Sequence, residues 1–218
     1  MNIWTSGSIL TASGLNSIFT TEEYHNHLGA TDNFMQTAYN GGLISGNITN
    51  HKMYLNSGLT SGSYGSFYSK KTWELGTRPI IVNGIIQDIV AGDGTNNNCI
   101  FGLASSFTSI GPLSIIIPDN FVGILINSGG SVTFYIMKGA PSAHSHGYSI
   151  TVVNGDLITI VASASECHLY VNGILQESET DTAVIPIGAL YLGAYAGAFY
   201  YERTVAGEIC IDFISIKQ

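Results

Sequence analysis

The sequence predicts an all-β protein, an antiparallel β-sandwich that follows a short helical or extended attachment segment. From about Ile44 onward, short apolar runs alternate with glycine-rich turns, and no run has the apolar spacing of a long helix. The pairs Asn83-Gly84, Asn154-Gly155 and Asn172-Gly173 are typical of tight hairpin turns, because both central residues must adopt positive φ. Gly accounts for 26 of the 218 residues and only 10% are charged, which suits one large β domain.

The predicted sandwich spans residues 46–218. Its expected strands are short runs rich in β-branched and aromatic residues, bounded by turn-forming residues. They cover Ile80–Val82, Ile85–Ala91, Cys99–Leu103, Leu113–Ile117, Val122–Ile126, Val132–Met137, Tyr148–Val153, Leu157–Ala162, Cys167–Val171, Ile174–Glu177, Ala189–Ala194 and Glu208–Ile216. Short strands at such regular spacing favour two packed antiparallel sheets.

Residues 1–45 differ from the rest of the chain and are predicted to form an attachment or oligomerisation segment. Thr11 can cap a helix, because its hydroxyl accepts a hydrogen bond from a first-turn N–H group. Leu15, Ile18 and Phe19 follow at spacings of three and four, so one side of this helix is apolar. A helix of roughly two turns is marginal alone and needs a partner to pack on.

Within this segment, Trp4–Asn16 reads W-x-x-G-x-I-L-T-A-x-x-L-N. This motif resembles the N-terminal segment of many phage tail-fibre and baseplate proteins. The resemblance implies a structural part of a virus particle that assembles with other virion proteins. It also implies a homo-oligomer, with a trimer favoured.

The segment Cys167–Glu177 has the clearest hairpin pattern, since apolar and polar residues alternate on both sides of Asn172-Gly173. Its string L-Y-V-N-G-I-L, over Leu169–Leu175, resembles a hairpin of the concanavalin A-like lectin/glucanase superfamily, which includes laminin G-like modules. The strands before and after it match the order in that superfamily, over 155–161, 190–194 and 207–216. The resemblance implies a concanavalin A-like jelly roll, a fold that hosts lectins, glycosidases, adhesion modules and capsid decorations.

Charge and hydropathy restrict the partners. With seven Lys and Arg against 15 Asp and Glu, the formal net charge is −8, so no nucleic-acid partner is expected. No apolar stretch approaches the roughly 18 residues of a membrane span, and the N-terminus lacks the pattern of a secretory signal. Either a leader was lost or the protein leaves the cell inside a virus particle, and we expect a virion location. The three widely spaced cysteines, in apolar runs, are expected to be buried thiols.

Two H-x-H pairs, His25/His27 and His144/His146, are candidate transition-metal sites. In an extended chain, residues two apart share a face, so each pair offers two imidazoles to one ion. Ser142–Gly147 resembles the H-x-H motif of phage fibre tips, in which three chains hold iron between them. Exposed polar loops account for both pairs without a metal.

Calcium is a second candidate ion. The loop Asp93–Asn98 is dense in carboxylate and amide oxygens, which calcium prefers as ligands. Turn formation explains the same residues without an ion. No cofactor is therefore certain from the sequence.

A run of aromatic residues near the C-terminus is the predicted ligand-binding patch. Tyr195, Phe199, Tyr200 and Tyr201 lie in or beside an expected loop, with Arg203 close by. Aromatic rings in an exposed loop favour the faces of sugars or a protein partner. An aromatic corner that packs on the sandwich is the alternative.

Acidic residues do not form the pattern of a glycosidase. Such an enzyme needs two carboxylates across a cleft, and glucanases of the resembled superfamily carry E-x-D-x-x-E or E-x-D-x-E on one strand. Neither string occurs here, and Glu208 and Asp212, four apart in the last strand, are expected to form a rim pair. The protein is therefore predicted not to be an enzyme.

These observations predict a non-enzymatic structural protein of a phage tail, fibre or baseplate that binds host-surface carbohydrate or another virion protein. The alternative is a secreted glycan-active enzyme or carbohydrate-binding module, and a capsid decoration protein is a third possibility. An enzyme requires paired carboxylates in a cleft. An adhesin requires a shallow aromatic patch, and a decoration protein requires a large apolar contact surface.

Overall fold

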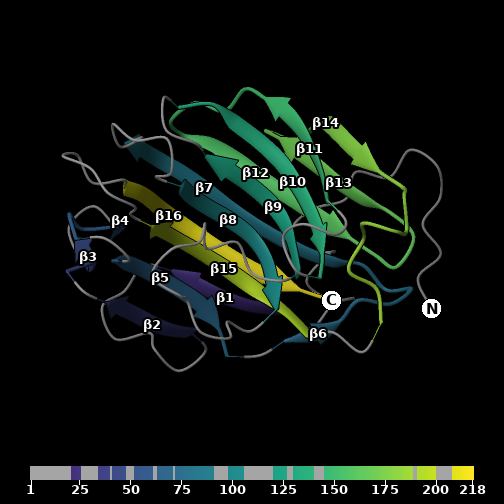
Figure 1. Cartoon of the computed structure of the whole chain (residues 1–218), viewed down its shortest axis with the longest axis horizontal. Coiled ribbons are helices and arrows are strands. Elements are labelled where there is room, and N and C mark those ends of the chain that lie inside the picture. The colour runs from purple at the N-terminus through teal and green to yellow at the C-terminus, as the bar shows by residue number, and fades with distance from the viewer. Residues whose placement is uncertain are drawn as a thin grey trace.

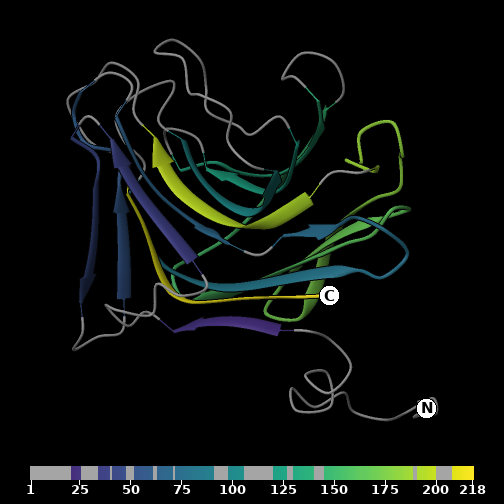
Figure 2. The same cartoon turned by 90° about the horizontal axis from the view of Figure 1, so that it is seen from below.

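The strands of this chain form two antiparallel sheets that pack face to face (Figure 1 and Figure 2). The computed structural model describes residues 21–25, 34–39, 41–47, 52–60, 63–70, 72–90, 98–105, 120–126, 130–139, 145–188, 191–199 and 208–218. Within these ranges all regular structure is strand, so the prediction of an antiparallel β-sandwich is confirmed. No helix that could cross a membrane occurs in them.

Sheet A has the strand order β14-β13-β12-β7-β16-β4-β3, and β1 pairs with β16 beside β4. Its strands are β14 (Ile174–Glu179), β13 (Cys167–Val171), β12 (Asp156–Ala162), β7 (Ile80–Val90), β16 (Glu208–Lys217), β4 (Lys52–Asn56), β3 (Leu43–Asn47) and β1 (Thr21–His25).

Sheet B has the order β11-β10-β9-β8-β15-β5-β2, and the short β6 also pairs with β15. Its strands are β11 (Ser145–Ile150), β10 (Val132–Lys138), β9 (Asn120–Ile126), β8 (Asn98–Ser105), β15 (Tyr191–Phe199), β5 (Tyr64–Ser69), β2 (Phe34–Tyr39) and β6 (Trp73–Glu74).

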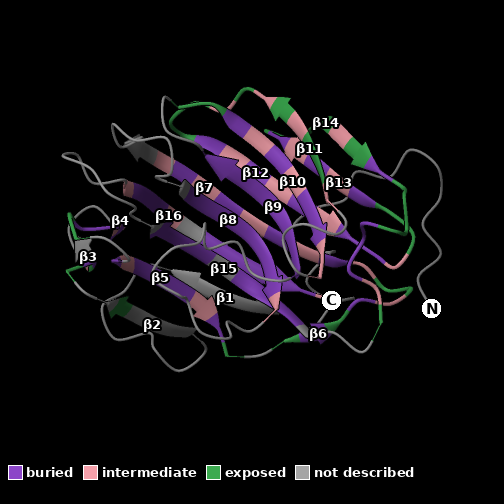
Figure 3. Ribbon diagram, in the orientation of Figure 1, coloured by how far each residue is buried: buried purple, intermediate pink, exposed green. Residues whose placement is uncertain are grey.

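The main core lies between the sheets and is built largely from alternate residues of their inner strands. Phe101 of β8, Phe134 of β10 and Phe67 of β5 project into it from sheet B and are fully buried. Ile158 and Leu169 meet them from sheet A. Figure 3 shows this burial along the central strands of both sheets. The three cysteines are also buried, with no disulfide between them, as their apolar context predicts.

The prediction of a hairpin turn at Asn83-Gly84 is wrong. Strand β7 runs through this pair and joins the two strands expected over Ile80–Val82 and Ile85–Ala91. Gly84 is required for close packing, because a Cβ there would lie 2.4 Å from Cζ of Phe101. Asn83 lies in a polar ladder across the sheet, where its Oδ1 accepts a hydrogen bond from Thr159 Oγ1 at 2.8 Å.

The other two Asn-Gly pairs do form turns, but only one closes a hairpin. Asn172 and Gly173 have φ values of 52° and 78° and join the neighbouring strands β13 and β14, as predicted. Asn154-Gly155 lies between β11 and β12, which belong to different sheets, so this turn carries the chain from sheet B to sheet A. Local sequence predicts a turn here but not which strands it connects.

Part of the segment expected to lie outside the sandwich is paired within it. Strand β1 pairs with β16, β2 pairs with β5, and β3 pairs with β4. The expected helix after Thr11 and the strand expected over Leu113–Ile117 lie outside the described residues. An attachment role for residues 1–45 stays a prediction.

Candidate functional site

The face of sheet B that points away from sheet A is the strongest candidate for a binding site. Figure 2 shows sheet B as a curved layer with this outer face on the inside of the curve. In β9, Val122, Ile124 and Ile126 point into the main core, yet the alternate residues are buried as well. Buried residues on both faces of a strand mean that its outer face is not an ordinary solvated surface.

The outer face carries an apolar cluster separate from the main core. Ile100, Ala104, Phe121 and Leu125 form its buried part, and Tyr64, Tyr68 and Tyr135 pack against it as partly buried side chains. We call this set of seven residues the aromatic face. Its tyrosines combine an apolar ring with a polar hydroxyl group, and they keep part of their surface exposed.

Strand register aligns one row of the aromatic face across the sheet. Tyr68 of β5 lies opposite Tyr195 of β15, which lies opposite Gly102 of β8. Gly102 lies opposite Gly123 of β9, which lies opposite Tyr135 of β10. Tyr68 and Tyr135 are therefore four strand spacings apart, roughly 19 Å. An extended ligand that crosses the strands would contact tyrosines on both sides of the two glycines.

The two glycines of this row cannot be replaced without movement of the sheet. A Cβ on Gly102 would lie 2.4 Å from the carbonyl oxygen of Val122. A Cβ on Gly123 would lie 2.4 Å from the carbonyl oxygen of Phe101 and 2.5 Å from Cζ of Phe121. The ring of Phe121 therefore lies over Gly123, and it is fully buried in the apolar layer between the tyrosines.

The aromatic face is nearly free of charge. Strands β2, β5, β8, β9, β10, β11 and β15 contain no Asp or Glu, and their one Lys, Lys138, ends β10. Uncharged apolar and hydroxyl groups suit a ligand that is itself neutral and amphipathic. A pair of carboxylates for glycoside hydrolysis would have to come from segments other than these strands.

The predicted aromatic patch is only partly described. The expected strand Ala189–Ala194 continues to Phe199 as β15, so Tyr195 lies within a strand and not in a loop, and Phe199 ends that strand. Continuous pairing with β5 and β8 extends the strand through the Gly/Ala-rich stretch. Tyr200, Tyr201 and Arg203 lie outside the described residues, and a ligand role for the patch stays a prediction.

Of the four histidines predicted to bind a metal, His146 has a described side chain. His27 and His144 lie outside the described residues, and His25 ends β1 opposite Phe213. Among the described residues, no three His, Cys, Asp or Glu side chains form a group that could hold a metal. The calcium-loop residues before Asn98 also lie outside them. Both metal predictions stay untested.

His146 instead contacts a buried carboxylate that joins the two sheets. Its Nδ1 lies 2.5 Å from Oε2 of Glu179, and the Tyr148 hydroxyl donates to the same oxygen at 2.8 Å. The other oxygen, Oε1, accepts from the backbone N–H groups of Thr180 and Asp181 at 2.8 and 2.7 Å. Because β11 and β14 are the terminal strands of their sheets, these contacts connect the two sheet edges.

Hydrogen bonding sets the ionisation of this carboxylate. Burial alone would raise the pKa of Glu179, but hydrogen bonds from the Asp181 N–H, His146 and Tyr148 outweigh it and lower the pKa. The hydrogen bond to Glu179 is in turn the main reason that the pKa of Tyr148 is raised. Glu179 is therefore held as a carboxylate and Tyr148 as a neutral donor.

The two acidic residues of the last strand contact different neighbours. Glu208 accepts a hydrogen bond from Asn56 of β4 at 3.1 Å, and Asp212 accepts one from Gln87 of β7 at 3.3 Å. Strands β4 and β7 flank β16 on opposite sides. This arrangement is not the facing pair of carboxylates that glycoside hydrolysis requires.

Sequence reasoning missed the tyrosines of the aromatic face, although a signal was present. Tyr64, Ser66 and Tyr68 alternate with the core residue Phe67, which places both tyrosines on the opposite face of β5. Tyr135 alternates with Phe134 in the same way. The contact between His146 and Glu179 has no such signal, because the two residues lie in different sheets.

No protein-family model matches this chain, and no curated protein matches its sequence. Solved structures match its fold. A β-1,3-1,4-glucanase (lichenase) derived from a mouse hindgut metagenome aligns with a TM-score of 0.60 and 11% identity, over 91% of this chain and 99% of that one. A glycoside hydrolase family 16 endo-glucanase from Bacteroides ovatus aligns with a TM-score of 0.59 and 8% identity, over 89% of this chain and 99% of that one. The carbohydrate recognition domain of Emp47p aligns with a TM-score of 0.57 and 13% identity, over 85% of this chain and 88% of that one.

These likenesses establish the fold as a concanavalin A-like jelly roll, as the hairpin motif predicted. The prediction that the protein is not an enzyme is contradicted, because two of these three neighbours are glucanases. The missing E-x-D-x-x-E string was too narrow a criterion, since a catalytic pair is defined by geometry and not by one spacing. The motif of Trp4–Asn16 lies outside the described residues, and the phage resemblance stays a prediction.

Proposed function

We propose that the protein binds a neutral glycan chain across the aromatic face of sheet B. The observation that carries this proposal is the set of three partly exposed tyrosines, Tyr64, Tyr68 and Tyr135, beside a buried apolar layer on strands without an acidic residue. Glucanases and a carbohydrate recognition domain among the neighbours of similar fold support it. Binding of this kind serves a carbohydrate-binding module and a glycan-active enzyme equally.

The physical basis is the amphipathic character of both partners. A sugar ring has an apolar face of C–H groups that packs on an aromatic ring, and its rim of hydroxyl groups needs hydrogen-bond partners. Tyr68 and Tyr135 supply rings and hydroxyl groups on both sides of the sheet centre. A face without carboxylates imposes no desolvation penalty for a buried charge on a neutral ligand.

Binding to a panel of neutral and acidic polysaccharides, which includes β-1,3-1,4-glucan, tests the proposal by affinity electrophoresis and calorimetry. Tyr68→Ala and Tyr135→Ala are each expected to weaken binding of a neutral glycan about tenfold, because a stacked aromatic anchor contributes over 1 kcal/mol. Tyr170→Ala is the matched control. Tyr170 is a partly buried tyrosine on the outer face of sheet A, paired with Thr159.

Two outcomes would overturn the proposal. One is that no glycan of the panel binds. The other is that Tyr170→Ala weakens binding as much as the two variants of sheet B. Release of new reducing ends is measured on the same panel. Cleavage would identify the protein as a glycan-active enzyme whose carboxylates lie outside strands β2, β5, β8, β9, β10, β11 and β15 of sheet B.

A more specific proposal is that the protein belongs to a virion and binds host-surface carbohydrate. It depends on the motif of Trp4–Asn16 and on the H-x-H segment Ser142–Gly147. Deletion of residues 1–20 tests it without removal of a described strand. The full chain is expected to form an oligomer, a trimer by preference, and the shortened chain a monomer that still binds glycan. A monomeric full chain in solution would contradict this proposal.

A further inference from the structure

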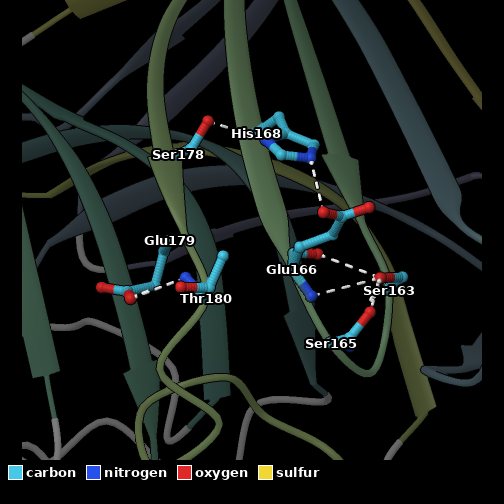
Figure 4. Close-up of polar contacts among 7 residues, drawn as sticks. All are labelled: Ser163, Ser165, Glu166, His168, Ser178, Glu179 and Thr180. Carbon is cyan, nitrogen blue, oxygen red and sulfur yellow. Dashed lines mark hydrogen bonds and ion pairs between the residues drawn. The ribbon is translucent and has the colours of Figure 1, made fainter.

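A second group of polar side chains lies on sheet A, away from the aromatic face. His168 of β13 contacts a hydroxyl with one ring nitrogen and a carboxylate with the other (Figure 4). Its Nδ1 lies 2.8 Å from Oγ of Ser178, and its Nε2 lies 3.3 Å from Oε2 of Glu166. The order hydroxyl, imidazole, carboxylate is the order of groups in a nucleophilic triad.

The carboxylate fixes the protonation that such chemistry needs. A carboxylate accepts hydrogen bonds only, so the tautomer of a neutral His168 ring that suits Glu166 carries its proton on Nε2. Nδ1 is then the unprotonated nitrogen, and it faces the hydroxyl of Ser178. His168 can therefore act as a base toward this hydroxyl.

The pairing of β13 with β14 and the turn before β13 position the three residues. His168 and Ser178 are direct partners in the β13–β14 register, which shifts between Leu169 and Tyr170 on the way to the Asn172-Gly173 turn. Glu166 precedes β13 in a turn closed by Ser163, whose Oγ accepts from the Glu166 N–H at 3.2 Å (Figure 4). A site built on adjacent strands holds its geometry better than one on a long loop.

The surroundings indicate the class of substrate. Ser178 is exposed, and the side chain of His168 is 21% exposed, so a substrate can reach both. Val161 lies opposite His168 on β12, and the Tyr170 ring meets the imidazole edge-on at 6.3 Å, so apolar groups border the site. Glu166 and the net charge of −8 disfavour an anionic substrate.

We propose that Ser178, His168 and Glu166 form an esterase site for carboxylic esters with a neutral acyl group. Ser178 Oγ attacks the ester carbonyl carbon while its proton moves to His168 Nδ1. The ester C–O bond then breaks, and the leaving alcohol takes the proton from Nδ1. Water attacks the acyl-serine and gives a proton to Nδ1, which returns it to Ser178 Oγ as the acid leaves. Ester and water thus become acid and alcohol.

Stabilisation of the developing oxyanion requires N–H donors near Ser178. Strand β14 is the terminal described strand of sheet A, and its backbone continues past Ser178 to Glu179. Edge strands present N–H groups that are not used in the sheet, and such groups are suitable donors to a carbonyl oxygen.

The test uses the full chain with p-nitrophenyl acetate as substrate and a fluorophosphonate as covalent probe. Peptide mass spectrometry is expected to find the phosphonyl adduct on Ser178. Ser178→Ala and His168→Gln are expected to lower the rate of ester cleavage about 100-fold or more, the range typical of general-base catalysis. Glu166→Gln is expected to give an intermediate rate, because the glutamine side chain can still orient the imidazole but carries no charge to stabilise its protonated form.

Ser149→Ala, an exposed serine of β11, is the matched control and should keep the rate of the natural chain. An adduct on another residue or no adduct at all would overturn the proposal, and so would equal rates for the Ser178→Ala variant and the natural chain. Labelling of the natural chain decides the matter even if a variant fails to fold. Glycan binding on sheet B is expected to be unchanged in Ser178→Ala, so this proposal and the proposed function fail separately.

Discussion

Strands β9 and β12 show how differently the two sheets use their outer faces. Both have seven residues and lie inside their sheets, β9 in sheet B and β12 in sheet A. Every residue of β9 is buried, whereas buried and partly exposed residues alternate along β12. Along β12, sheet A is therefore half-solvated, whereas along β9, sheet B has a second apolar layer on its outer face.

The side chains on the two outer faces differ in the same sense. Sheet A carries a polar ladder, in which Thr159 donates to Asn83 and Asn83 donates to Ser215 at 3.2 Å. Sheet B carries the aromatic face, in which Phe121 and Leu125 are buried beside partly exposed tyrosines. An apolar layer on a sheet surface is favoured when another molecule or segment contacts it, which is why binding is assigned to sheet B.

Matched leucines provide the largest test of this difference. Leu125 of β9 is 8% exposed on the outer face of sheet B, whereas Leu157 of β12 is partly exposed. Leu125→Ala is expected to lower the free energy of unfolding by about 2–4 kcal/mol, and Leu157→Ala by about 1 kcal/mol. Urea unfolding of both variants measures the two values. Equal costs would mean that the outer faces are equally solvated.

The glycines of the tyrosine row give a second, smaller test. Gly102→Ala is expected to cost about 1–3 kcal/mol, because its Cβ would lie 2.4 Å from the backbone oxygen of Val122 and the strands must separate. Gly147→Ala, in the same row, meets side-chain atoms of Thr133 and Tyr135 at 3.0 and 3.2 Å. These side chains can move, so an effect within about 0.5 kcal/mol is expected. A tolerated Gly102→Ala would contradict the close approach of β8 and β9.

The sequence predicts the sheets better than the connections between their strands. Alternation correctly located β12 and β13, because every second residue of each strand is buried in one core. The Asn172-Gly173 turn located β14, whose apolar residues Ile174 and Leu175 are exposed. Asn83-Gly84 has the composition of a turn, yet it lies inside β7 because Gly84 admits the ring of Phe101. The need for a glycine under a ring arises from a residue in the other sheet, and no local pattern contains it.

The candidate sites show the same limit. Alternation around Phe67 and Phe134 is sufficient to place the three tyrosines on the outer face of sheet B. The predicted ligand patch nevertheless lay nearer the C-terminus, around Tyr195–Arg203. By contrast, the position of Glu179 at the end of a strand is typical of an exposed, solubilising charge. Only the packing of β11 over β14 shows that it is buried beside His146.

The smallest expected effect concerns Glu179. This residue lies where the edges of the two sheets are joined, and not on either outer face. Its pKa is lowered in the folded protein, so its contribution to stability is present above the ordinary glutamate value of 4.5. This contribution is lost as the pH falls through the lower pKa of the folded state. Glu179→Gln keeps the shape of the side chain but removes the charge, and is expected to cost about 1 kcal/mol at neutral pH.

Urea unfolding of Glu179→Gln and the natural chain between pH 7 and pH 3 measures this contribution. The difference in free energy of unfolding should be largest at pH 7 and should shrink below about pH 4.5, because the protonated carboxyl of Glu179 then resembles the amide. Glu166→Gln is the control, since 53% of the Glu166 side chain is exposed, and its effect should be small throughout. A difference for Glu179→Gln that stays constant over this range would show that the sheet edges are joined by packing, without a contribution from the carboxylate charge.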